Sequence, residues 1–225
     1  MKIAIMQPYL FPYIGYFQLI HAVDRFIVYD DVTFIKQGWI NRNRILVNGE
    51  PLLFSVPLSG ASSNKLIRDI QINNAPYIVW RKKFFKTLEQ NYRKAPQYEK
   101  ILSIMKDVFG DEPQLISILA IRSIKVTCAY LDITTGILET AINYSNSHLK
   151  AEDRVIDICC KEHAQTYVNA AGGRELYNKD NFKRNGIDLY FLKSKYISYK
   201  QLEYPFIPWL SIIDVIDLSP EFSTP

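Results

Sequence analysis

The chain has 225 residues, of which 48% are hydrophobic and 22% are charged. This composition is that of an ordinary globular protein and excludes a disordered or collagen-like chain. With 27 basic and 23 acidic side chains, the net charge is +4, which permits an anionic ligand but gives no reason to expect a nucleic-acid partner. At about 150 residues per domain, the length predicts one domain across residues 1–225, with elaborations.

We expect neither a targeting segment nor a membrane span in this sequence. No apolar run approaches the ~20 residues that a membrane helix requires. The apolar start at residues 1–6 is too short for a signal peptide and meets Pro8 at once. The three cysteines include the adjacent pair Cys159 and Cys160 and form no disulfide framework, which is typical of reduced thiols. We therefore expect a cytoplasmic protein without membrane insertion.

The N-terminal segment has the pattern of a strand, a helix and a second strand. Residues 2–6 are a short apolar run typical of a buried strand, and residues 25–29 are another. Between them, Tyr16, Leu19 and Val23 recur at helical spacing. A strand–helix–strand unit of this length is characteristic of a parallel sheet.

The middle of the chain predicts a hairpin followed by helices. Asn48 and Gly49 are the preferred pair for a type I′ turn and lie between the expected strands 43–47 and 51–57. Helix-forming residues then dominate, and Pro113 is typical of a first helical turn. Three helices are expected, over residues 76–92, over residues 97–109 and from Pro113 onward.

The last part of the chain alternates strands and helices again. The expected strands cover residues 133–138, 166–169 and 187–192, and the expected helices cover residues 151–162 and 210–216. The predicted fold class is therefore α/β: a three-layer parallel-sheet domain of the Rossmann-like, nucleotidyltransferase-like kind. The helical section at about 76–131 is expected to be an insertion or cap on this domain.

Ligands of open parallel sheets bind beyond the carboxyl ends of the strands, and the first such loop covers residues 7–15. A glycine near a helix start allows close backbone approach, and the helix N-terminus favours an anion. Tyr16, at the start of the helix, is a candidate catalytic residue. The candidate binding residues are Gln7, Tyr9, Tyr13 and Gly15. The alternative is a turn whose aromatic side chains only pack.

The order strand, loop, aromatic-x-Gly-aromatic and helix resembles the nucleotidyltransferase superfamily, which carries His-x-Gly-His at this place. Tyr13 and Tyr16 stand at the two histidine positions. A tyrosine donates a hydrogen bond to a phosphate but cannot act as an imidazolium. The resemblance therefore implies a nucleotide site, while the two tyrosines argue against adenylyl transfer by the histidine route.

The second loop, residues 30–43, concentrates carboxylates, cations, amides and a tryptophan directly after a buried strand. Such polar groups are costly there unless they meet a ligand or each other. Asp31 is a candidate general base or amine-orienting group, and Lys36 a candidate catalytic cation for phosphate or carboxylate. The candidate binding residues are Trp39, Asn41, Arg42 and Asn43. The alternative is a structural network in which Asp30 and Asp31 pair with Arg42 or Lys36.

The third loop, residues 169–177, contains the candidate binding residues Gly172 and Gly173. Two glycines permit close backbone approach to an oxyanion, but a plain turn is the alternative, since the Gly-x-Gly-x-x-Gly and Walker spacings are missing. The three histidines are scattered and no Cys-x-x-Cys spacing occurs, so no metal site is expected. The basic helical face over residues 81–94 is interpreted as a solvated surface.

At these same residues the chain resembles the WbqC-like family, bacterial proteins encoded among genes for surface-polysaccharide and O-antigen biosynthesis. The shared motifs run almost from end to end and are Gln7-Pro8-Tyr9, Gly15-Tyr16-Phe17, Asp30-Asp31-Val32, Asn41-Arg42-Asn43, Gly172-Gly173 and Leu210-Ser211-Ile212-Ile213-Asp214. Two positions depart from the pattern: Phe11-Pro12-Tyr13 stands where a Pro-Trp pair is common, and Thr33 stands where Gln is common. These departures concern substrate specificity rather than membership.

The resemblance implies a role in building or modifying a nucleotide-linked sugar for O-antigen or lipopolysaccharide. The hypothesis is a transferase that moves an acyl or aminoacyl group onto an amino sugar. The alternative is a non-catalytic protein that holds a sugar nucleotide for a partner enzyme. ATP or a nucleotide-diphosphate sugar is the candidate cofactor, the expected partner is a small-molecule nucleotide sugar, and a homodimer stays open.

Overall fold

The structure, a computed structural model, describes residues 1–110, 112–195 and 198–218, and these form two compact units. Unit 1 comprises Met1–Gln7, Gly15–Asp31 and Ile133–Lys195. Unit 2 comprises Pro8–Ile14, Val32–Asp132 and the described part of Tyr196–Pro225. The assignment of the whole chain to one domain with a helical insertion or cap at about 76–131 stays a prediction.

Unit 1 is built on a five-stranded sheet. From one edge to the other, its strands are β7 (Gly136–Leu138), β2 (Arg25–Val28), β1 (Lys2–Met6), β8 (Thr166–Ala170) and β9 (Asp188–Leu192). Neighbouring strands of this sheet run parallel, which confirms the predicted parallel α/β fold. Numbered by their order in the chain, the strands lie 3-2-1-4-5, the order of a Rossmann-type sheet whose switch point falls between β1 and β8.

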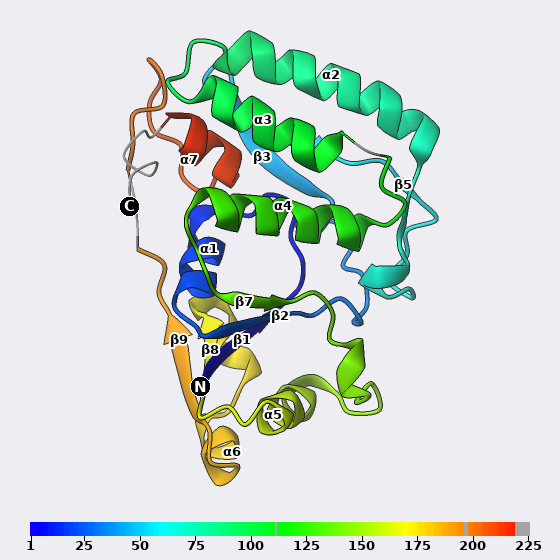
Figure 1. Ribbon diagram of the computed structural model, residues 1–225, viewed down its shortest axis with the longest axis vertical. Coiled ribbons are helices and arrows are strands. Elements are labelled where there is room, and N and C mark those ends of the chain that lie inside the picture. The colour runs from blue at the N-terminus through cyan, green and yellow to red at the C-terminus, as the bar shows by residue number, and fades with distance from the viewer. Residues whose placement is uncertain (111, 196–197, 219–225) are drawn as a thin grey trace. The chain divides into compact units, whose positions relative to one another are not determined.

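Helices cover both faces of this sheet and give unit 1 its three layers. They are α1 (Ile14–His21), α5 (Ala151–Lys161) and α6 (Lys179–Arg184). Ile27 of β2 shares an apolar cluster with Ile158 of α5 and Phe182 of α6. Phe26 points to the opposite face, where its ring packs edge to face on Tyr16 of α1 with centroids 5.4 Å apart. Figure 1 shows α1 on one side of the sheet and α5 and α6 on the other.

Unit 2 contains two antiparallel pairs of strands. They are β3 (Arg42–Val47) with β4 (Glu50–Ser55), and β5 (Leu58–Ser59) with β6 (Gln71–Ile72). The first pair is the predicted hairpin, and its turn residues Asn48 and Gly49 have φ values of 50° and 81°, as a type I′ turn requires. The sequence does not predict the second pair, because a strand of two residues is too short to show an alternation of apolar and polar side chains.

The helices of unit 2 are α2 (Asn74–Tyr92), α3 (Tyr98–Phe109), α4 (Ile116–Tyr130) and α7 (Ile212–Leu218) (Figure 1). A turn of 3-10 helix occurs in unit 2 at η1 (Ile67–Asp69), and unit 1 has such turns at η2 (Ile142–Tyr144) and η3 (Ala171–Leu176). The predicted helices at 76–92 and 97–109 agree with α2 and α3 within two residues. Over the ranges that the structure describes, no helix combines the length and the apolar character needed to cross a membrane.

The helix predicted to start at Pro113 starts three residues later, at Ile116. The reason is that the backbone before α4 is engaged by another segment. The Ile72 amide donates to the Gln114 carbonyl at 2.8 Å, and the Ile116 amide donates to the Ile70 carbonyl at 3.0 Å. These long-range hydrogen bonds hold the segment before Ile116 extended, so Pro113 lies outside the helix.

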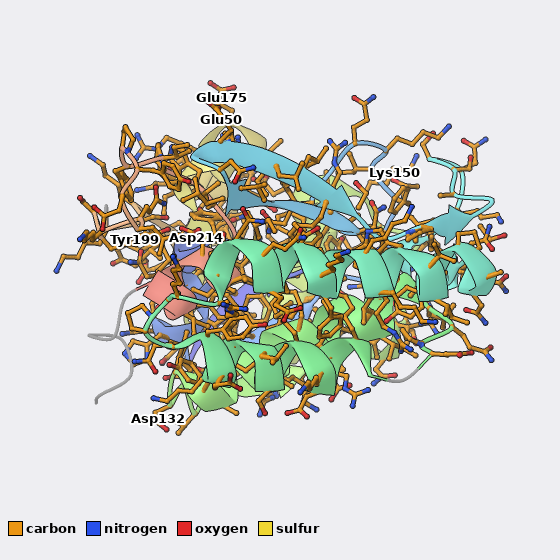
Figure 2. All side chains as sticks on the ribbon, turned by 90° about the horizontal axis from the view of Figure 1, so that it is seen from above. Glu50, Asp132, Lys150, Glu175, Tyr199 and Asp214 are labelled. Atoms are coloured by element: carbon orange, nitrogen blue, oxygen red, sulfur yellow. The ribbon has the colours of Figure 1, made fainter. Side chains whose placement is uncertain are left out.

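A buried carboxylate connects the C-terminal helix to the rest of unit 2. Asp214 of α7 is fully buried and accepts hydrogen bonds from the Tyr92 hydroxyl at 2.7 Å, from Gln201 Nε2 at 2.9 Å and from the Tyr199 hydroxyl. The Tyr92 oxygen also accepts the Leu46 amide of β3 at 2.7 Å. Figure 2 shows Tyr199 and Asp214 beside each other. Burial raises the pKa of Asp214, and the three donors oppose that rise without cancelling it.

The raised pKa of Asp214 predicts a pH-dependent stability difference. The folded state holds the Asp214 proton more tightly than the unfolded chain does. The free energy of unfolding of the wild type should therefore fall, relative to that of Asp214→Asn, as the pH rises from about 4 through the raised pKa. Urea unfolding of both proteins between pH 4 and pH 8 measures this difference. The exposed Asp107→Asn is the control, and a wild-type difference from Asp214→Asn that stays constant with pH would contradict the prediction.

Candidate functional site

The predicted site residues divide between the two units. Those in unit 1 are Gln7, Gly15, Tyr16, Asp31, Gly172 and Gly173. Those in unit 2 are Tyr9, Tyr13, Lys36, Trp39, Asn41, Arg42 and Asn43. The two groups are therefore described separately. The role predicted for each residue stays a prediction, except where its contacts favour another role.

The polar side chains of unit 1 follow the strands at the carboxyl end of the sheet. Side chains two positions apart on a strand point to the same face. The inward residues Ile5, Ile27 and Tyr167 belong to the apolar cluster beneath α5. Two positions further along their strands lie Gln7, Tyr29 and Asn169, and Asp31 follows Tyr29 at the same spacing. On the face of the sheet that α5 covers, the inward side chains are therefore apolar along the strands and polar where the strands end.

Asp31 is paired with Arg154, an arginine of α5. The guanidinium binds the Asp31 carboxylate through Nη2, and the two side chains are 5% and 6% exposed. Arg154 also donates to the Asp31 carbonyl at 3.2 Å, and its guanidinium lies 4.9 Å from the ring centroid of Tyr29. The structural alternative predicted that Asp31 pairs with Arg42 or Lys36. Asp31 does form an ion pair, but its partner is Arg154. The partner comes from the helix that packs on this end of the sheet.

Arg154 was not found among the candidate residues, although its position gives a signal. It lies within the apolar face of α5, one residue before Val155 and four before Ile158, which are both buried. An arginine on such a face needs a buried partner. The guanidinium is further fixed by Asn146, whose Oδ1 accepts from Arg154 Nε at 2.9 Å.

Two buried oxygens at this end of the sheet accept no hydrogen bond from the described residues. They are Gln7 Oε1, directly after β1, and Asp31 Oδ1, the carboxylate oxygen that Arg154 does not bind. Leaving a buried acceptor unsatisfied costs about 1–3 kcal/mol. Hydroxyl or amino groups of a ligand would satisfy both oxygens. Two acceptors at this end of the sheet thus lack a donor among the described residues.

The tyrosines around this cluster remain protonated at neutral pH. Burial raises the pKa of Tyr29 to about 12 against the opposing charge of Arg154. Burial also raises the pKa of Tyr177, and it raises that of the fully buried Tyr167 well above the usual value. These phenols can donate hydrogen bonds, but they cannot act as general bases near neutral pH.

The two glycines of the third loop have different surroundings. They lie in η3, which follows β8 directly. A Cβ on Gly173 would lie 3.2 Å from Asn169 Nδ2, so packing over Asn169 explains that glycine. A Cβ on Gly172 would meet nothing within 4 Å among the described residues. Gly172 is exposed, so its backbone is accessible to a ligand.

Tyr16 has a structural position. It is 3% exposed, and its hydroxyl donates to the Gln7 carbonyl at 2.8 Å. This bond fixes the backbone of the residue that carries the unsatisfied Oε1. The geometry therefore favours a positioning role for Tyr16 over the predicted catalytic one. Gly15 is buried beside it in α1, and its role as a binding residue stays a prediction.

In unit 2, the amides of the second loop bind backbone rather than open space. Asn43 Nδ2 donates to the carbonyls of Leu10 and Phe11 at 3.0 and 2.7 Å. Asn41 Nδ2 donates to the Val56 carbonyl at 3.0 Å. Both amides thus hold loops in place, which favours a structural role over the predicted ligand contact.

The two cations of the second loop also differ. Arg42 donates through Nε to the Gly38 carbonyl at 2.9 Å and through Nη2 to the Gln37 carbonyl. Its guanidinium lies 5.9 Å from the ring centroid of Trp39. Arg42 therefore stabilises its own loop. Lys36 is exposed, and its role as a ligand-binding cation stays a prediction.

A pocket of about 170 Å³ lies within unit 2. It brings together four of the predicted residues, Tyr9, Tyr13, Trp39 and Asn43, with Pro12, Arg44 and Trp209. Trp209 and Arg44 are not among the predicted site residues, and the place of Arg44 in a predicted strand gave no reason to distinguish it. The pocket is an aromatic enclosure with one cation.

Comparison with known proteins supports the resemblance found in the sequence. Residues 7–221 match the profile of the WbqC-like protein family. The chain is also similar to the uncharacterized protein Rv1507c of Mycobacterium tuberculosis, with 32% identity over 218 residues that cover 96% of this chain and 92% of that protein. No solved structure matches the chain significantly. The matched range includes residues of both units.

The ion pair of Asp31 and Arg154 predicts a large effect of breaking it. Arg154→Met keeps the apolar stem but leaves the Asp31 carboxylate buried without its cation. We expect the free energy of unfolding to fall by about 3–5 kcal/mol at pH 7. Urea unfolding measures this, with Arg184→Met on the exposed end of α6 as the control. A loss below 1 kcal/mol would show that the pair is not held in the folded protein.

Proposed function

Since the chain belongs to the WbqC-like protein family, we propose that it acts in bacterial surface-polysaccharide biosynthesis as a transferase on a nucleotide-linked amino sugar. The group transferred is an acyl or aminoacyl group. The observation that carries this proposal is the pair of unsatisfied buried oxygens, on Gln7 and Asp31, at the carboxyl end of a Rossmann-order sheet. Sheets of this order bind nucleotides at that end.

The sugar nucleotide is proposed to lie along the switch point between β1 and β8. Gln7 Oε1 follows β1, and the exposed backbone of Gly172 follows β8. The amide oxygen suits a hydroxyl donor of the ligand. The exposed glycine suits close approach by a diphosphate. Gln7 thus provides a hydrogen-bond acceptor for the ligand, and Gly172 provides room for its diphosphate.

Asp31 is proposed to orient the amino group of the sugar. One carboxylate oxygen is occupied by Arg154, and the other is available to accept an N–H. The amine nitrogen then attacks the carbonyl carbon of an activated acyl donor. A nitrogen–carbon bond forms, the bond between that carbon and its leaving group breaks, and the leaving group departs with the proton that nitrogen loses.

One observation favours a second candidate, a binding protein that presents the sugar nucleotide to a partner enzyme. In unit 1 the carboxylate is neutralised by Arg154, and Tyr29 and Tyr177 have raised pKa values. The described part of this cluster therefore offers no strong base. Pyrophosphate exchange with ATP and candidate amino acids separates the two functions. Exchange supports an aminoacyl transferase, whereas nucleotide-dependent thermal stabilisation without exchange or acyl transfer supports the binding protein.

The proposed site predicts that Gln7→Met weakens sugar-nucleotide binding without destabilising the protein. Gln7 Oε1 has no partner among the described residues, so its loss breaks no internal hydrogen bond. Losing one buried hydrogen bond to the ligand should raise the Kd for UDP-glucosamine about tenfold, or about 1.4 kcal/mol. Isothermal titration measures the Kd, and thermal unfolding measures stability.

The matched control is Gln90→Met, which changes an exposed glutamine on α2. It should leave both the Kd and the Tm unchanged. If UDP-glucosamine and UDP both bind Gln7→Met as tightly as they bind the wild type, the ligand does not use this end of the sheet. If neither compound binds the wild type at millimolar concentration, the proposed class of substrate is wrong.

A further inference from the structure

The pocket of unit 2 has a size and a wall that suit one sugar ring. Its volume of about 170 Å³ is well below the roughly 300–1,000 Å³ of sites for larger ligands. A whole nucleotide sugar is therefore too large for it. The aromatic residues of the wall are Tyr9, Tyr13, Trp39 and Trp209. Flat faces of this kind pack against the C–H groups of a sugar ring while leaving its hydroxyls accessible.

Trp209 is presented as an exposed platform by strained backbone. Its side chain is 56% exposed, which is unusual for so large an apolar group. Its φ is 63°, a value that a bulky residue rarely adopts. Two residues further on, the Ser211 amide donates to the Arg44 carbonyl at 2.9 Å, and the Trp209 ring meets the Tyr13 ring edge to face with centroids 5.7 Å apart. Strain of this kind concentrates at sites of function.

Arg44 gives the pocket a cation with an unsatisfied edge. Its Nε is buried and has no acceptor among the described residues. Its Nη2, on the same edge of the guanidinium, makes one long hydrogen bond of 3.3 Å to the Trp209 carbonyl. The guanidinium lies 5.5 Å from the ring centroid of Trp39. A carboxylate can bind such an edge through two parallel hydrogen bonds.

The other polar groups of the pocket favour an anion as well. The residues that line it include no Asp or Glu. The Asn43 amide nitrogen is occupied by the carbonyls of Leu10 and Phe11. Burial raises the pKa of Tyr9, so its phenol remains a neutral donor. The pocket therefore presents donors and aromatic faces, and it carries a positive charge.

We infer that unit 2 binds the ring of an acidic monosaccharide, of the uronic acid class. The ring stacks on Trp209, and its carboxylate binds the Nε and Nη2 edge of Arg44. This binding site stands on the pocket alone and goes beyond the sugar-nucleotide site of unit 1. One part of the inference rests on the proposed function: that the acidic sugar bound in this pocket belongs to the substrate.

The test uses the tryptophans as reporters in the full-length chain. The chain has three, so Trp80→Phe leaves Trp39 and Trp209 as the fluorophores. This protein is titrated with methyl glucuronide and with methyl glucoside at matched ionic strength. We expect saturable fluorescence change with a Kd for the glucuronide at least tenfold lower than that for the glucoside. Equal affinity for the two, or no saturation with either, overturns the inference.

Two further variants identify the residues. Arg44→Met should remove the preference for the glucuronide, whereas the exposed Arg93→Met should keep it. If Arg44→Met retains the preference, the carboxylate is not bound by Arg44 and the inference fails. Trp209→Ala, measured by calorimetry, should weaken both sugars at least tenfold and does not depend on Arg44→Met folding. Unchanged affinity in Trp209→Ala also overturns the stacking.

The outcome is separable from that of the proposed function. Gln7→Met should bind methyl glucuronide as the wild type does, because Gln7 is not among the residues that line the pocket. Glucuronide binding without UDP-glucosamine binding would support the pocket and contradict the proposed function. UDP-glucosamine binding without glucuronide binding would do the reverse.

Discussion

The ion pair between Asp31 and Arg154 is the interaction on which the polar end of unit 1 depends. It links the segment after β2 to α5, the helix that covers one face of the sheet. A buried pair of this kind adds little net stability, because desolvating both charges offsets most of their attraction. Instead, the pair fixes the position of the Asp31 carboxylate. One oxygen binds the guanidinium, and the other has no donor among the described residues. Gln7, held by Tyr16, adds a second such oxygen.

Unit 2 uses hydrogen bonds to backbone for the same purpose. Phe11 has a φ of 43°, and its carbonyl accepts from Asn43 Nδ2 at 2.7 Å and from Ser211 Oγ at 2.8 Å. These bonds connect three distant segments: the first loop, β3 and the start of α7. The side chains that project from these segments, among them Tyr13 and Trp209, form the aromatic pocket. Polar residues with fixed partners thus hold the frame, and we propose that the aromatic residues of the pocket meet a ligand.

The period-two and period-3.6 patterns predicted most of the fold. Contacts between residues close in the sequence determine the βαβ start, the hairpin at Asn48-Gly49 and the main helices. These elements could therefore be predicted, and the structure contains them. The late start of α4 and the short pair β5 and β6 were not predictable, because long-range backbone hydrogen bonds decide them. The candidate site was predicted as a set of loops. Its partners were not: Arg154 lies more than a hundred residues after Asp31, and no local pattern connects the two.

We propose that the carboxyl end of the parallel sheet in unit 1 binds a nucleotide. Titration of 15N-labelled protein with UDP, followed by NMR, tests it directly. We expect the earliest and largest shifts at the side-chain amide of Gln7 and the backbone amides of Gly172 and Gly173, while the amides of Gly60 and Gly186 stay unchanged. Shifts confined to other residues, or none at saturating UDP, would contradict it.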